Sequence, residues 1–323
     1  GAKYGKDAIG VAVSDRYTNE EAFAIKKMAE TMGAKIFSMN NRASGIADVL
    51  GFDASPNTID ELLSTNMILA VGFNTTDNPV IELKMKQAAE AGAKVVLVNP
   101  EDYVQHIDFL NKAVYTKNDL SFLKEVAKAV VDSGRGAGVD GYEEFAASVK
   151  DVTVSDDAKA VADMYLEAKK AMIVFNQNLI TTEAASLLAD IALVSGHIGT
   201  PRDGILQVKA KNNSQGLVDL GITAGAEELE GVKALVVFGE EADIDTDALE
   251  FLAVSDTHMT ALAAKADVVI PGTGFASTDG TYTNTERRLQ LVQAAIEEDV
   301  ELANWEIAAE IAHVFEVDYE WDN

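Results

Sequence analysis

Short runs of β-branched and other apolar residues alternate along the chain with stretches whose apolar residues recur at helical spacing. This alternation is typical of a parallel sheet covered by helices. The runs are almost continuously apolar, which indicates strands buried on both faces. The pattern predicts strands at residues 8–13, 67–72, 94–99, 171–176, 233–239, 252–255 and 267–271. It predicts helices at residues 19–32, 80–91 and 119–133, and a C-terminal helix with Ala303, Ile307, Ile311 and Phe315 on one core-facing stripe.

Two glycine-rich stretches interrupt the pattern. Residues 133–141 place Gly136, Gly138 and Gly141 at the GxGxxG spacing of nucleotide-binding loops. They follow a predicted helix, whereas that fingerprint requires a preceding strand, so we interpret them as a connector. Residues 196–204 contain three glycines and Pro201, and they mark a second boundary.

The charge balance restricts the possible partners. The chain has 323 residues, 48% of them hydrophobic, which is enough for two lobes with their own cores. With 26 Lys and Arg against 53 Asp and Glu, its formal charge of −27 repels nucleic acid and anionic membranes. Ten acids and no Lys or Arg follow residue 288, and this stretch is either a solvated face or a docking face for a basic partner.

Several kinds of site are excluded by the residue types. The chain has no cysteine, so disulfides, thiol nucleophiles and cysteine-bound iron–sulfur clusters are absent from this segment. The four histidines show no zinc-binding spacing, and we expect no metal site. No apolar run approaches the roughly 18–20 residues of a membrane helix. We expect a cytoplasmic protein without direct membrane insertion.

Small polar residues follow the predicted strands, at the edge where open parallel sheets bind ligands. Gly72 allows a sharp turn, and Asn74, Thr75 and Thr76 can cap the next helix or present N–H groups to a phosphate. Residues 283–286 have the pattern of a helix cap followed by an acid. Two adjacent bases, Arg287 and Arg288, indicate a charged partner, although pairing with nearby acids explains them equally well.

Four segments, taken in order along the chain, resemble turns of the molybdopterin oxidoreductase superfamily. This superfamily includes formate dehydrogenase alpha subunits and the G subunit of NADH dehydrogenase I. Residues 14–21 resemble S-x-R-x-T-N-E-E, and residues 71–80 resemble G-x-N-x-x-x-N-x-P-V. Residues 196–201 and 211–216 resemble G-N-I-G-x-P and Q-N-N-x-Q-G. Residues 278–288 resemble E-G-T-F-T-N-x-E-R-R. Four collinear matches across nearly the whole chain make the resemblance specific.

The resemblance implies two Rossmann-like α/β lobes with mainly parallel sheets, one inserted in the other. Residues 1–36 and 200–323 would form the discontinuous lobe, and residues 37–199 the inserted lobe. The family cofactor is molybdopterin guanine dinucleotide, and iron–sulfur clusters would lie upstream of this segment. The matching positions that would line the cofactor cleft are Gly72, Asn74, Thr75, Asn213, Gln215, Asn284 and Arg287.

The chain departs from the family pattern where the metal and the phosphates would be held. Formate dehydrogenases place a Cys or selenocysteine, followed by His, after the first helix, but residues 37–45 contain neither. The family's arginine-rich D-P-R turn is Asn-Pro-Glu-Asp at residues 99–102, and its P-G-T-D turn is Thr-Lys-Asn-Asp at residues 116–119. Because phosphates are recognised by cations, we predict no cofactor, no metal and no catalytic residue in this chain.

Three functions remain open. The leading hypothesis is a cofactor-free module of a redox complex subunit, like the G subunit of NADH dehydrogenase I, that supports electron transport through clusters outside this chain. Its partners would be other subunits or domains of that complex. The alternatives are a formate-dehydrogenase-like catalytic domain that binds the cofactor through the retained turns, and a nucleotide-binding module that uses one phosphate turn.

Overall fold

The computed structural model describes residues 3–39, 44–240, 243–297, 300–315, 317 and 319. The chain divides into two compact units: unit 1 comprises Gly1–Ala43 and Ala210–Asn323, and unit 2 comprises Ser44–Lys209. The sequence placed the inserted lobe at residues 37–199, so it predicted the two boundaries between residues 36 and 37 and between residues 199 and 200. Each unit contains one five-stranded parallel sheet, so the predicted α/β class with two mainly parallel, Rossmann-like sheets is confirmed. Among the residues that the structure describes, no helix is both long and apolar enough to cross a membrane.

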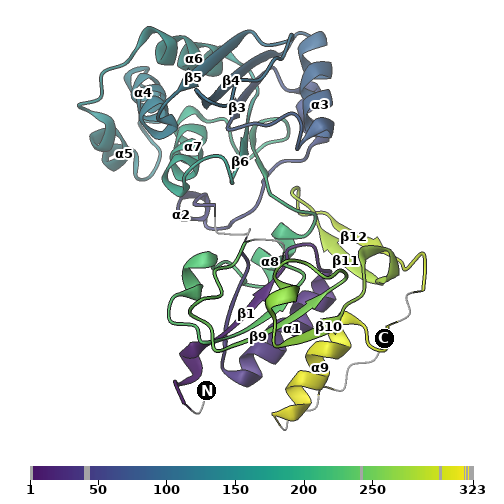
Figure 1. Ribbon diagram of the computed structural model, residues 1–323. Helices are drawn as coiled ribbons and strands as arrows, with labels where there is room; N and C mark the ends of the chain where they lie inside the picture. Colours follow the sequence, from purple (N-terminus) through teal and green to yellow (C-terminus); the bar gives the residue numbers. More distant parts are fainter. Residues whose placement is uncertain are drawn as a thin grey trace. The chain divides into compact units, whose positions relative to one another are not determined.

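Unit 1 is built on a sheet whose strand order reverses between β1 and β8. In spatial order the strands are β10 (Val268–Pro271), β9 (Phe251–Asp256), β8 (Ala234–Phe238), β1 (Ile9–Val13) and β2 (Lys35–Phe37). The helices are α1 (Asn19–Met32), α8 (Ser214–Asp219) and α9 (Asn304–Val314), with 3-10 turns η1 (Lys6–Ala8), η3 (Ala226–Leu229), η4 (Ala263–Lys265) and η5 (Phe275–Ser277). In Figure 1, α1 and α9 lie side by side, and their apolar residues share one core with the sheet.

Unit 2 has the same kind of sheet, and its strand order reverses between β3 and β6. In spatial order the strands are β5 (Lys112–Thr116), β4 (Lys94–Pro100), β3 (Met67–Val71), β6 (Ala171–Asn176) and β7 (Gly204–Val208). The helices are α2 (Ala47–Leu50), η2 (Asp60–Ser64), α3 (Pro79–Glu90), α4 (Asp119–Asp132), α5 (Tyr142–Val149), α6 (Asp156–Glu167) and α7 (Thr182–Ser195). The glycine-rich stretch 133–141 lies between α4 and α5.

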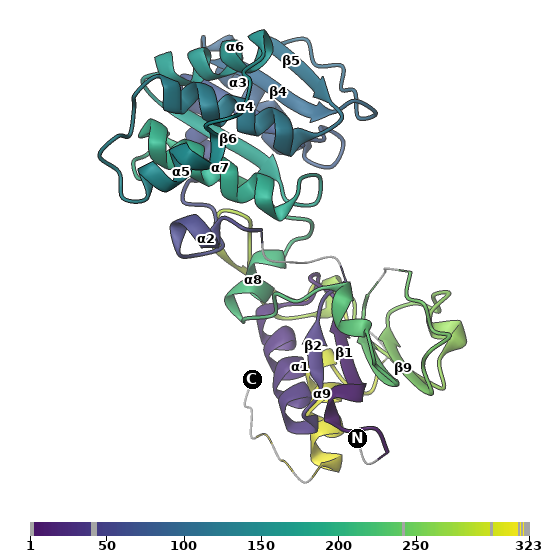
Figure 2. The ribbon, with the colours of Figure 1, turned by 90° about the vertical axis from the view of Figure 1, so that its left-hand side faces the viewer.

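Side chains of the unit 2 strands alternate between two cores, one on each face of the sheet. Along β3, Met67, Leu69 and Val71 pack in the core with α4, α6 and α7. Ile68 and Ala70 point the other way, into the core with α3. Figure 2 shows α4 and α7 grouped together in this unit. This two-sided burial explains why the strand is apolar at every position.

Five observed strands were missed by the sequence pattern. They are β2, β5, β7 and the two strands of a hairpin, β11 (Gly280–Thr283) and β12 (Leu289–Val292). β7 begins within the stretch interpreted as a glycine-rich boundary and pairs with β6 of unit 2. Its Gln207 is fully buried, but the side chain donates to Gln177 Oε1 at 2.7 Å, so a polar residue interrupts the apolar run without breaking the strand.

The predicted helices are close to the observed ones, but the C-terminal stripe is only partly buried. α1 starts at a capping box in which Thr18 and Glu21 each accept a hydrogen bond from the other's backbone N–H. In α9, Ile307 is 2% exposed and belongs to the unit 1 core. Phe315 follows the end of α9 and is 46% exposed, so it does not continue the buried stripe.

The hairpin of β11 and β12 lies outside the five-stranded sheet and is held by the first turn of α1. The Glu20 carboxylate accepts hydrogen bonds from Thr281 N at 2.7 Å and Thr281 Oγ1 at 2.8 Å. Asn19 Nδ2 donates to Thr281 Oγ1 and Thr283 Oγ1, both at 3.1 Å. A two-stranded ribbon is marginally stable by itself, so these bonds determine where the hairpin lies.

Glu21, the next residue of α1, is a buried carboxylate with partners from three segments. It accepts hydrogen bonds from Thr18 N at 2.8 Å, from Asn304 Nδ2 at 2.7 Å and from Thr278 Oγ1 at 3.4 Å. Burial raises the pKa of Glu21 above its ordinary value, and these hydrogen bonds offset only part of that effect. Glu21 thus connects α1 with the start of α9 and with the loop before β11.

Asn213 makes a second buried connection in unit 1. Its Nδ2 donates to Tyr17 O at 2.8 Å, and its Oδ1 accepts from Thr283 N at 2.8 Å. Its backbone N donates to Asp15 O at 3.0 Å, and the side chain is fully buried. One amide therefore joins the turn after β1, the start of α8 and β11.

We predict that Asn213→Ala destabilises unit 1 because it leaves Tyr17 O and Thr283 N buried without partners. Each unsatisfied group costs about 1–3 kcal/mol, so the loss of both partners should lower the free energy of unfolding by about 2–6 kcal/mol. Urea unfolding followed by tryptophan emission measures this loss. The matched control is Asn212→Ala at the exposed neighbouring position, where the change should stay within about 0.5 kcal/mol. Equal losses in the two variants would contradict the assignment.

Candidate functional site

In each unit, the carboxyl ends of the strands next to the reversal of strand order form the edge where open α/β sheets bind ligands. The residues predicted to line a cleft lie at these edges or in the hairpin. Gly72, Asn74 and Thr75 follow β3 in unit 2, and Asn213, Gln215, Asn284 and Arg287 belong to unit 1. The surroundings of each residue show whether it is available to a ligand.

The turn after β3 starts with a glycine whose backbone conformation and close neighbours disfavour any side chain. Gly72 has φ of 60°, and a Cβ at this position would lie 2.7 Å from Ile180 Cγ2. Its N–H donates to Val98 O at 2.9 Å. Next to it, Phe73 N donates to Asn99 Oδ1, and Asn99 Nδ2 donates back to Phe73 O, both at 2.9 Å. The fully buried Asn99 therefore fixes the turn to the end of β4.

Asn74 closes a local turn and does not cap α3. Its Oδ1 accepts from Thr76 N at 2.9 Å, and its Nδ2 donates to Asp77 at 2.6 Å. The N-cap of α3 is Asn78, whose side chain makes no capping bond. The expectation that residues 74–76 cap the helix was therefore wrong, because the chain makes an Asx-type turn before α3 begins.

Thr75 is bound to a neighbouring loop of unit 2. Both its N and its Oγ1 donate to Gln105 Oε1, at 3.4 and 2.9 Å. The backbone N–H groups of Gly72, Phe73, Thr75 and Thr76 thus all donate to acceptors within unit 2. A phosphate bound at a strand-to-helix turn needs such N–H groups to be available. In this fold, these four N–H groups are therefore already used within unit 2.

A buried polar cluster at the ends of β6 and β7 was not predicted. Lys209 Nζ lies 3.4 Å from Asp53 Oδ1, with side chains 1% and 7% exposed, and it donates to Gln177 Oε1 at 3.1 Å. Ser44 N and Oγ donate to Asp53 at 2.8 and 2.7 Å. Burial raises the pKa of Asp53, but the charge of Lys209 and the bonds from Ser44 outweigh it, so the pKa is lowered. The sequence signal for this cluster was Lys209, a lysine directly after the apolar run of β7.

At the corresponding edge of unit 1, two buried acids follow adjacent strands. Asp15, after β1, accepts a hydrogen bond from Ser214 Oγ, and burial raises its pKa. Its Oδ1 has no hydrogen-bond partner within the described ranges. Glu240, after β8, is 2% exposed and accepts from Met39 N at 3.0 Å. The charges of Lys211 and Arg16 act on Asp15, so this edge carries both buried acids and nearby bases.

The predicted cleft residues of unit 1 are also engaged within the fold. Asn213 makes the connections described above, next to Thr283 of β11. Gln215 is 1% exposed, and its Nε2 donates to Asp219 within α8 at 2.9 Å. Their side chains stabilise the fold of unit 1.

Asn284 and Arg287 lie in the loop of the hairpin. Asn284 Oδ1 accepts from Glu286 N at 3.1 Å and from Arg288 N at 2.9 Å. Arg287 is exposed and has φ of 58°, and Arg288 forms an ion pair with Glu286 at 3.4 Å. The helix cap predicted at residues 283–286 was wrong, because antiparallel pairing of β11 with β12 makes this segment a hairpin loop.

Residues 37–45, where formate dehydrogenases hold the metal according to the resemblance, are only partly described. Residues 40–43 lie outside the described residues, whereas Met39 N is bound to Glu240 and Ser44 to Asp53. Within the described ranges, no group of three or more His, Cys, Asp or Glu side chains is close enough to hold a metal ion.

Comparisons with known proteins identify relatives over nearly the whole chain. The F420-dependent formate dehydrogenase subunit alpha of Methanocaldococcus jannaschii is 26% identical over 387 aligned residues, which cover 95% of this chain and 57% of that protein. Formate dehydrogenase H of Escherichia coli is 24% identical over 96% of this chain and 54% of its own length. The chain therefore spans little more than half the length of these relatives.

Two solved structures share the fold. A chain of the formyltransferase/hydrolase complex (FhcABCD) from Methylorubrum extorquens, determined with methylofuran, matches with a TM-score of 0.66 at 15% identity, over 97% of this chain and 94% of that one. Acetylene hydratase from Pelobacter acetylenicus matches with a TM-score of 0.68 at 12% identity, over 98% of this chain and 56% of that one. At such identities the likeness shows the fold alone.

The family is shown by a match that leaves out only the last few residues. The model of the molybdopterin oxidoreductase family covers residues 1–314, and it therefore includes both sheets and all four of the motif segments. This chain belongs to the molybdopterin oxidoreductase family.

Proposed function

We propose that this chain is a cofactor-free structural module of a redox complex, of the type of the G subunit of NADH dehydrogenase I, with electron transport through clusters outside this chain. The turn after β3 is the observation that carries the proposal. Its N–H groups at Gly72, Phe73, Thr75 and Thr76 already donate within unit 2. A dinucleotide phosphate would have to break these bonds before it could bind.

The charges at the two edges support the same conclusion. The buried base of unit 2, Lys209, is neutralised by Asp53, and the edge of unit 1 carries Asp15 and Glu240. Molybdopterin guanine dinucleotide in its paired form carries four phosphates, which proteins bind through charge-assisted hydrogen bonds from available cations. The unit 2 edge has a lysine paired with an acid, and the buried acids of the unit 1 edge have only Lys211 and Arg16 nearby, so the edges offer few cations for four phosphates.

Partner subunits follow from the proposed role. The relatives from methanogens are named as alpha subunits, and one structural neighbour is a chain of a multi-subunit complex. That neighbour is matched over 94% of its length, so a chain of this extent with this fold can be one subunit of an assembly. We infer that other subunits or domains of a redox complex cover part of this chain.

A formate-dehydrogenase-like catalytic domain is the second candidate. It is favoured by the 24–26% identity to formate dehydrogenase alpha subunits over 95–96% of the chain. This function would require the turn after β3 to rearrange so that its N–H groups become available. A nucleotide-binding module that uses the same turn would require the same rearrangement.

We predict that the protein purified from a host that makes the pterin cofactor carries far less than one molybdenum or tungsten atom per chain, and no guanine nucleotide. Elemental analysis and chromatography of the acid-released nucleotide measure both. Formate dehydrogenase H of Escherichia coli, produced in parallel, is the positive control. Stoichiometric metal together with guanine nucleotide would overturn the scaffold proposal in favour of the catalytic alternative.

We also predict that Lys209 serves the fold as the counter-ion of Asp53. Asp53→Asn leaves the lysine buried without its counter-ion and should lower the free energy of unfolding by about 3 kcal/mol at pH 7. The double variant Asp53→Asn/Lys209→Met removes both charges and should recover more than half of that loss. Chemical denaturation at several pH values measures each difference.

The pH dependence has a definite sign, because the pKa of Asp53 is lowered in the folded chain. The stabilisation by this carboxylate is complete above the ordinary aspartate pKa of about 3.9, and it disappears as the pH falls through the lowered value. The penalty of Asp53→Asn should therefore shrink in acid. The control is Asp48→Asn at an exposed position of α2, which should cost less than about 0.5 kcal/mol. A double variant as unstable as the single one would contradict the pairing.

A further inference from the structure

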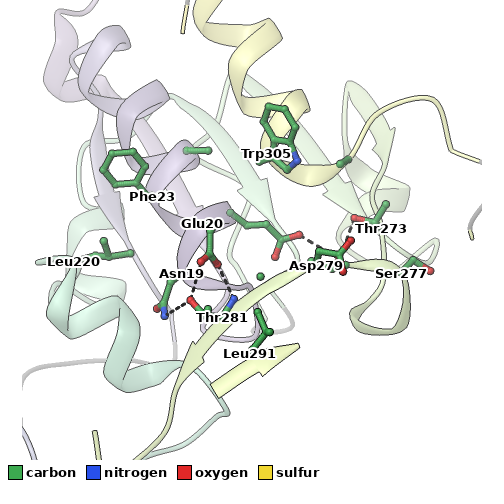
Figure 3. A pocket seen from close by; sticks show the side chains of 15 residues that line it. Asn19, Glu20, Phe23, Leu220, Thr273, Ser277, Asp279, Thr281, Leu291 and Trp305 are labelled. Atoms are coloured by element: carbon green, nitrogen blue, oxygen red, sulfur yellow. Dashed lines mark hydrogen bonds between the residues drawn. The ribbon is translucent and has the colours of Figure 1, made fainter. Parts of the chain in front are cut away.

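A groove on unit 1 lies outside the sheet edge described above. It has a volume of about 890 Å³ and runs between α1, the hairpin and the start of α9. Figure 3 shows Phe23, Trp305 and Leu291 around it, together with the hydrogen bond that Thr281 accepts from Asn19 and those that it donates to Glu20. The function proposed above uses none of this surface.

The walls of the groove are apolar and open to solvent. Phe23 is 41% exposed, and Leu291 on β12 is 73% exposed. Leu289 is 64% exposed and lies two residues away on the same face of β12, so the apolar wall continues beyond the groove. A small-molecule site buries about 70–90% of its ligand, which such an open wall cannot do. The surface is better suited to a polypeptide segment.

The groove is negatively charged. Among the residues found to line it, Glu20, Glu21 and Asp279 are acidic, and none is Lys, Arg or His. Two lysines of α1 are already engaged, because Lys26 donates to Leu220 O at 2.6 Å and Lys27 to Glu30 at 2.8 Å. Residues 289–323, which include part of the lining, contain ten acids and no Lys or Arg. Charge complementarity therefore selects a basic occupant.

We propose that this groove binds an amphipathic helix of a partner subunit, with apolar residues at positions i, i+3 or i+4, and i+7, and Lys or Arg beside them. The apolar side chains would contact Phe23, Leu291 and Trp305, and the cations would face Glu20 and Asp279. This is the helix-in-groove mode of recognition. This proposal rests on the scaffold function proposed above and specifies the kind of partner segment that the scaffold would bind. Metal content tests that role, whereas peptide binding tests the groove alone.

The test uses a labelled amphipathic helix of leucine and lysine, of about 18 residues and thus about five turns. Fluorescence anisotropy measures its binding to the full chain. We expect Leu291→Lys to weaken binding on the order of tenfold, because it removes an apolar contact and places a positive charge that repels the lysines of the peptide. The emission of Trp305 should shift to the blue when the peptide binds, and Trp305→Phe should abolish that shift.

Two controls separate the groove from general attraction to an acidic protein. Val80→Lys adds the same charge at a position that is 62% exposed on α3 of unit 2, and it should weaken binding less than about twofold. A peptide of the same composition, scrambled so that it has no apolar face, should bind at least about tenfold more weakly than the amphipathic one. Circular dichroism checks that each variant is folded.

Three results would overturn the proposal. Equal losses for Leu291→Lys and Val80→Lys would show binding by overall charge. Equal affinities for the scrambled and the amphipathic peptide would show that the apolar wall does not contribute to binding. A dimer in sedimentation that Leu291→Lys converts to a monomer would mean that a second copy of this chain occupies the groove.

Discussion

The first turn of α1 holds unit 1 together through three consecutive polar side chains. Asn19 and Glu20 fix β11 of the hairpin, and the buried Glu21 binds the start of α9 and the loop before β11. These segments are far apart in the sequence and make no continuous sheet with one another. The bonds of Asn19 and Glu20 fix the hairpin and the buried bond from Asn304 to Glu21 fixes the start of α9, so the position of both depends on this turn.

The requirement that buried donors and acceptors find partners also gives residues of the family motifs a role in the fold itself. Asn213 satisfies backbone groups of the turn after β1 and of β11, and Asn74 closes its own turn by accepting from Thr76 N. Residues of these motifs thus contribute to folding whether or not a ligand binds. A preserved motif is therefore better evidence for the fold than for the activity.

The two kinds of surface in unit 1 have different physical properties. The sheet edge carries the buried acids Asp15 and Glu240, and the charges of Lys211 and Arg16 act on Asp15. The groove beside the hairpin combines solvent-exposed apolar walls with carboxylates, a combination that favours a basic polypeptide. The proposed scaffold role is compatible with both properties, because a module of an assembly needs contact surfaces and no reactive centre.

Periodicity and residue type alone determined the α/β class, the strands buried on both faces, the limits of α1 and the absence of cysteine chemistry from this segment. These features depend on neighbours close in sequence. Periodicity did not reveal the edge strand β5, the short strand β7 with its buried Gln207, or the hairpin, because their partners are remote and their apolar runs are short or interrupted by polar residues. Whether the N–H groups of the turn after β3 can bind a ligand was also decided by tertiary structure. Only folding brings the side chains of Asn99 and Gln105 to the N–H groups of Phe73 and Thr75. A hydrogen-bond donor is free or occupied according to what lies next to it in space, and sequence spacing does not contain that information.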